Sequence, residues 1–294
     1  MQTLELTIVI PTHNRAEILS RCLEHLAEQT FQDFQVIVID DGSTDNTKEV
    51  AHSWSFRFKN FKYIHQENLG QGNARNNGLN HALGNIILFI GDDILLIRTA
   101  LQEHMFTHKK HPEIRVAVLG LVLWHPDITI TDFMQWLTNG REGGTQFAYD
   151  LLKGKETADF NFFYTSNISI KRKLLEKHKF DPDFKSYGWE DIELGYRLTK
   201  EENLKIHYNK SAVGYHYHEI NEESLAERMK SIGRSSRIFH KKHPELKKLP
   251  PIWKRIALWF ISRKPILSIA KKRNKNFYYY ALSKRYFLIG LRRV

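Results

Sequence analysis

Short apolar runs alternate with helix-period segments over the first hundred residues, and this alternation constrains the fold more than any other feature. The runs at 6–10, 36–39 and 86–90 are continuous and rich in β-branched residues, as expected for strands buried on both faces. A weaker strand is expected at 63–64. Strands that alternate with helices predict an α/β fold, Rossmann-like, with a mostly parallel central sheet.

The helices are predicted by apolar residues that recur on one face. The first of them is marked by Ile18, Leu19, Cys22, Leu23 and Leu26. Further helices are expected at 46–54, 73–83, 132–137, 191–199 and 222–240, and further strands at 116–123, 167–170, 204–208 and 213–217. Gly140, Gly143 and Gly144 predict a mobile loop.

The charge is distributed unevenly along the chain. The formal net charge is +11, but no acidic residue follows Glu245, and the last 45 residues hold 12 of the 44 Lys and Arg side chains. The rest of the chain is therefore close to neutral. We expect a folded domain at 1–245 and a basic tail at 246–294.

Composition and cysteine content limit the class of protein. Hydrophobic residues make up 41% of the 294-residue chain and charged residues 26%, which is typical of a folded globular protein. A single cysteine, Cys22, excludes an internal disulfide framework and favours a reducing compartment. No apolar run is long enough to span a bilayer, and the first residues do not resemble a signal peptide. We therefore expect a cytoplasmic protein.

Polar clusters follow the predicted strands at 11–15, 40–43, 66–76 and 92–93. The carboxyl ends of parallel strands meet at one edge of a sheet, where open α/β sheets bind their ligands. The four clusters are therefore expected to share one rim.

Asp92 and Asp93 end a buried strand, where two carboxylates repel each other unless a cation lies beside them. Mg²⁺ or Mn²⁺ would relieve this repulsion and bring phosphate oxygens as further ligands. The alternative is a solvated turn, because Asp is common after strands.

The clusters at 11–15 and 40–43 each allow two interpretations. Asp41 either belongs to a turn that starts the next helix or accepts a hydrogen bond from a base N–H or a ribose hydroxyl. The segment at 11–15 is either a rigid turn into a helix or a set of backbone amides that face a nucleotide base.

The loop at 68–76 contains glycines and leads into a helix that carries Arg75 on its first turn. Backbone amides, the positive helix end and the guanidinium together would bind an anion. The alternative is a flexible loop with a solvated arginine. Neither the dinucleotide fingerprint nor the P-loop pattern is present.

Two groups later in the chain are further candidates. Trp189, Glu190 and Asp191 stand at the start of a predicted helix. The two acids either form a charged first turn or supply a general base, with Trp189 as a flat wall for a sugar ring. His216 and His218 lie on one face of a predicted strand, as structural residues or as metal ligands that suit Mn²⁺ better than Mg²⁺.

Taken in order, these motifs resemble the family 2 glycosyltransferases with the GT-A fold, which move a sugar from a nucleotide diphosphate donor to an acceptor hydroxyl. The matching text is TIVIPTHNR at 7–15, VIDDGSTD at 38–45, GNARN at 72–76 and DD at 92–93. FDPDF at 180–184 and YGWEDIELGYRL at 187–198 are similar to the acceptor-side motif of the galactosyltransferase-like members. The resemblance covers about residues 5 to 240. It implies a catalytic domain at 1–245, with a nucleotide-binding half at 1–98 and an acceptor-side half at 99–245.

The resemblance implies roles for individual residues. Asp93 and either His216 or His218 would bind Mn²⁺ or Mg²⁺. Asp191 would be the catalytic base, with Glu190 beside it. The residues expected on the nucleotide-sugar donor are Pro11, Thr12, Asn14, Arg15, Asp41, Gly72, Arg75, Asp92 and Trp189, of which Pro11 and Asp41 would contact the base and Arg75 the diphosphate. The family commonly carries Asp-x-Asp, whereas this chain has Gly91 at the first acid, so Asp92 is the candidate replacement on the ribose.

The function implied is an inverting, metal-dependent transfer of a sugar from a nucleotide sugar to a glycan or lipid-linked acceptor in cell-surface polysaccharide or glycoconjugate synthesis. The donor is expected to be UDP-linked, because UDP-sugars are the most frequent donors in the family.

The tail at 252–294 mixes aromatic and basic residues, which is typical of segments that lie on anionic membranes. We therefore expect the enzyme on the inner face of the cytoplasmic membrane. The alternative for the tail is a helix packed on the catalytic domain.

Other functions remain as alternatives. A catalytically inactive sugar-nucleotide-binding protein would carry the same motifs, and a nucleic-acid-binding protein would use the basic tail, although no specific nucleic acid is expected. A nucleotidyltransferase would need a glycine-rich, basic signature near the first strand, and none stands there.

Overall fold

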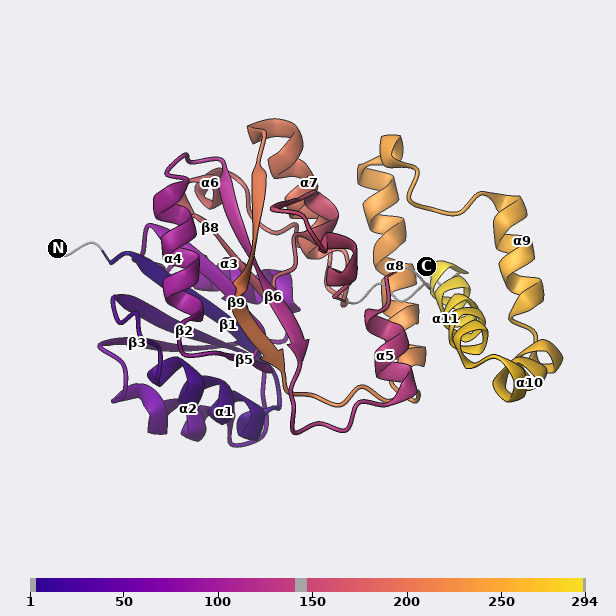
Figure 1. Ribbon diagram of the computed structural model, residues 1–294, viewed down its shortest axis with the longest axis horizontal. Coiled ribbons are helices and arrows are strands. Elements are labelled where there is room, and N and C mark those ends of the chain that lie inside the picture. Colours follow the sequence, from indigo (N-terminus) through magenta and orange to yellow (C-terminus); the bar gives the residue numbers. More distant parts are fainter. Residues whose placement is uncertain (1–3, 141–146, 293–294) are drawn as a thin grey trace. The chain divides into compact units, whose positions relative to one another are not determined.

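The computed structural model describes residues 4–140 and 147–292, which divide into two units (Figure 1). The first unit contains the described residues of 1–128, 152–185 and 191–218, and the second contains those of 129–151, 186–190 and 219–294. The boundary predicted at residue 245 therefore lies inside the second unit. None of the helices in the described ranges is both long and apolar enough to cross a membrane.

A mixed sheet is the core of the first unit. Its nine strands, counted over the described residues, run in the order β3-β2-β1-β4-β8-β6-β9-β5, with β7 also paired to β9. The strands are β1 (Leu6–Thr12), β2 (Phe34–Asp41), β3 (Asn60–Gln66), β4 (Ile86–Ile90), β5 (Ile94–Leu96), β6 (Val116–Trp124), β7 (Thr157–Ala158), β8 (Asn167–Lys171) and β9 (Lys205–His216).

Strands β3, β2, β1 and β4 are parallel, and β8 then runs antiparallel to both β4 and β6. Every residue of β1, β2 and β4 is buried, which explains their unbroken apolar runs. The predicted α/β fold with a mostly parallel central sheet is confirmed, and its four neighbouring parallel strands form one side of the sheet. The strands expected at 204–208 and 213–217 form one strand, β9, whose pairing with β6 shifts register between Gly120 and Leu121.

Helices α1 (Ala16–Ala27) and α2 (Thr47–Ser55) pack together, and α3 (Gln71–Leu79) packs on β1 and β2. Helix α4 (Ala100–Lys110) packs on β6 and β9, while α6 (Arg172–Lys177) follows β8 (Figure 1). Helix α7 spans Glu190–Glu202. Helix α3 ends at Leu79 rather than at 83, because the amides of Asn80 and His81 bond in a tighter turn to the carbonyls of Asn77 and Gly78.

The sequence pattern did not predict α4, because its buried face is mostly polar. His104, Thr107 and His108 are buried beside Ala100 and Leu101. His104 contacts Asn167 Oδ1 through Nε2 at 2.9 Å and Ser169 Oγ through Nδ1 at 2.8 Å. A helix that buries hydrogen-bonded side chains lacks the apolar period that marks the other helices.

The second unit consists of helices: α5 (Asp132–Thr138), α8 (Leu225–Lys242), α9 (Ile252–Ile261), α10 (Lys264–Arg273) and α11 (Lys275–Arg292). Helix α11 packs along α8, and a β-carbon at Gly233 or Gly290 would overlap a carbonyl oxygen of the other helix. The two backbones therefore touch at these glycines. The predicted helical tail is confirmed. Gly140 donates a hydrogen bond to Asp150 Oδ1 at 3.2 Å, whereas Gly143 and Gly144 lie outside the described residues.

Candidate active site

The loops that follow β1 and β4 are joined by side-chain hydrogen bonds. Thr12 Oγ1 donates to Asp92 Oδ2 at 2.7 Å, and Arg15 donates to Asp92 Oδ1 and to Asp93 Oδ2, each at 2.9 Å. One guanidinium therefore bridges both carboxylates. The sequence predicted that Arg15 contacts the donor but did not predict this ion pair with the acids.

Hydrogen bonds also join the loops that follow β1 and β2. Ser43 Oγ accepts from the backbone N–H of Asn14 at 2.8 Å, and Asn14 Oδ1 accepts from the N–H of Thr44 at 2.7 Å. Asn14 holds a left-handed φ of 52°, a conformation that asparagine tolerates better than most residues. Pro11 is buried at the end of β1, opposite Ile39. The predicted rim of loops at one edge of the sheet is therefore confirmed.

Burial and neighbouring charges act in opposite directions on the acid pair. Burial raises the pKa of Asp92; Arg15 counters this effect, and Asp93 adds to it. Burial would also raise the pKa of Asp93, but His216 and Arg15 together lower it below its ordinary value. Asp93 is thus the carboxylate that the surrounding cations keep ionised.

His216 lies beside the acid pair at the end of β9. Its Nε2 is 3.4 Å from Asp93 Oδ2, and its ring is edge-on to Trp124 with centroids 5.0 Å apart. His218 is exposed just beyond the strand, with its ring centroid 6.1 Å from that of His216. The structure therefore places His216 closer to the acid pair and leaves His218 at the surface.

The donor set around Asp93 fits a divalent cation that is shared with a ligand. Within the described ranges, no three His, Cys, Asp or Glu side chains converge to hold a metal by themselves. Asp93 supplies an ionised oxygen and His216 a nitrogen, a pair of ligands that suits Mn²⁺. Phosphate oxygens would complete the coordination, as is usual where few protein ligands are present.

Asp41 holds the loop that leads into α3. Its Oδ1 accepts hydrogen bonds from Gln66 Nε2 at 2.8 Å and from the N–H of Leu69 at 2.9 Å, and its Oδ2 accepts from the N–H of Gly70 at 2.9 Å. Gly70 has φ of 89°, and a β-carbon there would lie 2.7 Å from the carbonyl oxygen of Lys185. The predicted turn at 40–43 is present, with a φ of 86° at Gly42 and a hydrogen bond of 2.8 Å from the N–H of Ser43 to Asp40 Oδ1. Asp41 itself bonds to the loop before α3 and not to the start of α2, and its contact with the base stays a prediction.

Arg75 is buried on α3 rather than solvated, so the alternative of a solvated arginine is wrong. Its guanidinium carbon lies 5.5 Å from the ring centroid of Phe180, and it donates to Gln71 Oε1 at 3.2 Å. Asn76 exchanges two hydrogen bonds with the backbone of Phe180, at 2.8 and 2.9 Å. Helix α3, with Gly72 buried in its first turn, is thus fixed to the segment at 180.

The residues predicted for the acceptor side belong to both units. In the first, Asp191 Oδ1 accepts from the N–H of Ile192 at 2.8 Å. In the second, Glu190 accepts from the N–H of Gly188 at 3.1 Å, and the Trp189 ring lies 4.8 Å from that of Phe239. A role of these three residues beside the acid pair stays a prediction.

The sequence analysis missed Cys22 as a neighbour of the acid pair. Its thiol lies 3.9 Å from the carbonyl oxygen of Gly91 and 3.6 Å from that of Ile94. Burial, followed by the charges of Asp92 and Asp93, raises its pKa well above the ordinary value, so the thiol stays protonated. No sequence signal marked this contact, because Cys22 fits the apolar period of α1.

Comparison with known proteins identifies the family. A family model described as "Glycosyl transferase family 2" matches residues 7–178, which is more than half of the chain. The chain belongs to glycosyl transferase family 2. The matched range contains the Arg15, Asp92 and Asp93 cluster and the Asp41 loop, and the resemblance in the sequence motifs is confirmed.

Curated relatives of this glycosyltransferase include two bacterial glucosyltransferases. "Validoxylamine A glucosyltransferase" of Streptomyces hygroscopicus subsp. jinggangensis is 35% identical over 216 residues, which are 66% of this chain and 51% of that protein. "GalNAc(5)-diNAcBac-PP-undecaprenol beta-1,3-glucosyltransferase" of Campylobacter jejuni is 30% identical over 206 residues, 69% of this chain and 62% of that protein. The chain thus spans less than two thirds of these relatives.

Solved structures show the same fold. The mannosyltransferase PcManGT of Pyrobaculum calidifontis, in complex with GDP-Man and Mn²⁺, has a TM-score of 0.63 at 19% identity and covers 99% of this chain and 86% of its own. TarS 1–349 of S. aureus, in complex with UDP, has a TM-score of 0.57 at 17% identity over 98% and 90% of the two chains. The predicted GT-A fold is therefore confirmed.

Proposed function

We propose that this glycosyltransferase moves a sugar from a nucleotide-diphosphate sugar, UDP-linked, to a hydroxyl group of a glycan or lipid-linked acceptor, with inversion at the anomeric carbon. The observation that carries the proposal is the cluster of Arg15, Asp92, Asp93 and His216 at the carboxyl ends of β1, β4 and β9. Two acids, one guanidinium and one imidazole suit a diphosphate that carries a divalent cation.

Asp93 and His216 would hold the cation, Mn²⁺ or Mg²⁺, with His218 at the edge of the site. The cation would offset the negative charge that grows on the leaving diphosphate. Arg15 and Arg75 would stabilise the same charge from the protein side. Pro11, Thr12, Asn14, Asp41 and Asp92 would contact the nucleoside, because they line the rim where α/β sheets bind nucleotides.

Asp191 would act as the general base, with Glu190 and Trp189 forming the acceptor side. It would take the proton of the acceptor hydroxyl as that oxygen bonds to the anomeric carbon. The bond from this carbon to the diphosphate would break on the opposite face, with its electron pair leaving on the diphosphate oxygen. The transition state would resemble an oxocarbenium ion, as in glycoside hydrolysis.

Two substitutions separate the roles of base and metal ligand. Asp191→Asn keeps an oxygen for the N–H of Ile192, so we expect donor binding to persist while sugar transfer falls by a factor of about 10² to 10⁴. Asp93→Asn should weaken Mn²⁺-dependent donor binding. Thermal stabilisation by UDP-sugars with Mn²⁺ measures binding, and release of UDP measures turnover.

Asp127→Asn is the matched control, because this aspartate is 76% exposed and lies outside the cluster. If all three variants bind and turn over donor like the parent, the assigned roles are wrong. Binding without turnover in the parent itself would favour the inactive sugar-nucleotide-binding protein.

We also propose that residues 252–294 hold the enzyme on an anionic membrane surface, at the inner face of the cytoplasmic membrane. A basic segment rich in aromatic side chains supports this, since each Lys or Arg near such a surface contributes about 1 kcal/mol. The name of the Campylobacter relative includes an undecaprenol-linked acceptor, a lipid that such a location would make accessible.

A further inference from the structure

Helix α9 turns an apolar face to solvent. Its large apolar side chains that are exposed recur at i, i+1, i+4, i+7 and i+8, which is one side of a helix. They are Ile252 (74% exposed), Trp253 (71%), Ile256 (62%), Trp259 (45%) and Phe260 (56%). Leu258 is the buried residue of the same helix. An apolar stripe on the outer rather than the inner side of a helix indicates a surface that meets a partner.

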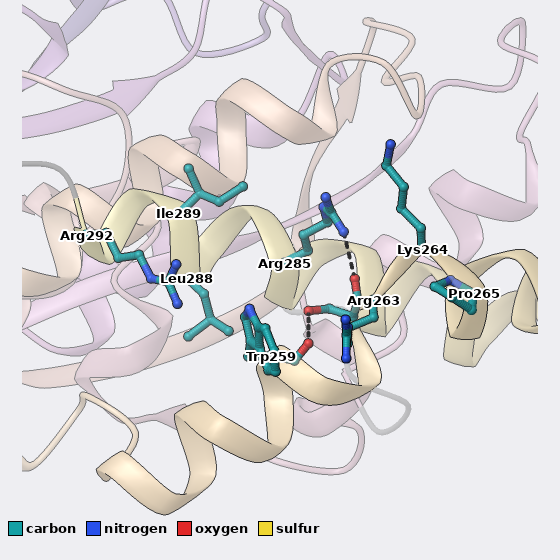
Figure 2. A pocket seen from close by; sticks show the side chains of 9 residues that line it. Trp259, Arg263, Lys264, Pro265, Arg285, Leu288, Ile289 and Arg292 are labelled. Carbon is teal, nitrogen blue, oxygen red and sulfur yellow. Dashed lines mark hydrogen bonds between the residues drawn. The ribbon is translucent and has the colours of Figure 1, made fainter.

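A basic pocket adjoins this stripe. It has a volume of about 420 Å³ and lies between the corner that joins α9 to α10 and the last turns of α11 (Figure 2). Its lining contains Trp259, Arg263, Lys264, Arg285, Leu288 and Arg292, together with Ser262, Pro265 and Ile289. Among the described residues, four cations and no carboxylate line it.

Contacts within the pocket hold its walls in place. Arg285 donates to the carbonyl oxygen of Ser262 at 3.0 Å, and the Arg263 guanidinium lies 5.1 Å from the Trp259 ring centroid. The four like charges around this pocket repel one another, and a bound anion would relieve that repulsion.

The chemistry of the lining selects the kind of anion. Guanidinium groups match phosphate oxygens with paired hydrogen bonds. Trp259, Leu288 and Ile289 form an apolar wall beside them. A phosphate group that is attached to a hydrocarbon chain fits both halves of the pocket.

We propose that this pocket binds the phosphate of an anionic phospholipid while the exposed face of α9 enters the bilayer interface. Aromatic side chains prefer this interface, and basic residues beside them bind anionic headgroups. The proposal rests on the membrane attachment of residues 252–294 and does not depend on sugar transfer. It adds a defined phosphate-binding pocket to the general electrostatic attraction between the basic tail and an anionic membrane.

The test compares two variants that lose the same charge from the same part of the chain. Arg263→Gln/Lys264→Gln removes two cations that line the pocket. Lys272→Gln/Arg273→Gln removes two exposed cations at the other end of α10, outside the lining. Co-sedimentation is measured with vesicles of phosphatidylcholine alone, with added phosphatidylglycerol, and with added oleate, which supplies negative charge without a further phosphate.

We expect the parent to bind phosphatidylglycerol vesicles more tightly than oleate vesicles of equal charge. The pocket variant should lose roughly tenfold more affinity for phosphatidylglycerol than the control variant, because charge-assisted hydrogen bonds are lost and not only surface charge. Equal losses in the two variants, or no preference for the phospholipid in the parent, would overturn the headgroup site. Stabilisation by inorganic phosphate that equals the stabilisation by the vesicles would assign the pocket to a free anion instead.

The apolar face is tested separately with Trp253→Gln/Ile256→Gln, two exposed positions whose change should not disturb folding. Binding to all anionic vesicles should fall, whereas Phe56→Gln/Phe106→Gln, at two exposed aromatics outside the tail, should leave it unchanged. If the parent sediments as a dimer without lipid and the α9 variant as a monomer, the face joins two copies and the proposal fails. UDP-sugar hydrolysis by every variant reports the proposed function independently.

Discussion

The buried histidine of α4 should make the first unit sensitive to mild acid. His104 is fully buried, and burial lowers its pKa to about 4, against the hydrogen bond to Asn167, which raises it. The side-chain N–H groups of Asn167 donate to the carbonyl oxygens of Leu121 and Ala212. Its Oδ1 therefore accepts a hydrogen bond from the N–H at His104 Nε2. Nδ1 then accepts from Ser169, and the ring is neutral.

The magnitude follows from the difference between the two states. An unfolded histidine takes up a proton below a pKa of about 6.5, whereas folded His104 does so only near 4. The unfolded state therefore binds more protons in this window, and the free energy of unfolding falls as the pH falls. Between pH 7.5 and 5 the loss from His104 is about 2 kcal/mol. His108, whose pKa burial also lowers, adds to it.

Urea unfolding at the two pH values measures this loss, and amide hydrogen exchange of β8 reports the first unit by itself. His104→Gln keeps a donor and an acceptor but does not titrate, so its loss between pH 7.5 and 5 should be about 2 kcal/mol smaller than that of the parent. His52→Gln, at an exposed histidine of α2, is the control. If His104→Gln and the parent lose the same free energy, the buried ring does not control the acid sensitivity.

Two further substitutions test the acid pair and the helix contact of the second unit. Arg15→Gln leaves the buried Asp92 and the partly buried Asp93 without their guanidinium, so we expect the free energy of unfolding to fall by about 3 kcal/mol. We also expect a larger thermal stabilisation by Mn²⁺ than in the parent, and an equal Mn²⁺ effect in both would contradict the bridging role. Gly290→Ala forces α11 away from α8 and should lower the unfolding free energy by about 1–3 kcal/mol, measured by urea unfolding, whereas Ser268→Ala at an exposed position of α10 should have little effect.

The sequence predicted those parts of the fold that local patterns encode. Continuous apolar runs marked β1, β2 and β4, and their order along the chain brought the polar loops after them to one rim. Helix α4 was not predicted from the sequence. Its buried side chains His104, Thr107 and His108 are polar and form hydrogen bonds, so the helix shows no apolar period. The packing of α8 on α11 was also not predicted, because it depends on the contact of Gly233 with α11, which no local sequence pattern shows.

The candidate site was predicted as a set of residues but not as a set of contacts. Arg15 and Asp92 are 77 positions apart, and only the folded sheet shows that they form an ion pair. The structure also distinguishes the two histidines, since His216 is buried beside Asp93 and His218 is exposed. Spacing along a strand placed both on one face and could not rank them.

The bonds of Asp41 limit which residues of this rim could be replaced without moving its loops. The same carboxylate fixes the end of β2 and the entry to α3, so replacing it would displace Arg75 together with the loop. His13 and Asn68, in contrast, are exposed at the same rim and contact each other at 3.4 Å. Substitutions meant to alter ligand binding at this rim should therefore vary His13 and Asn68 and keep Asp41 as it is.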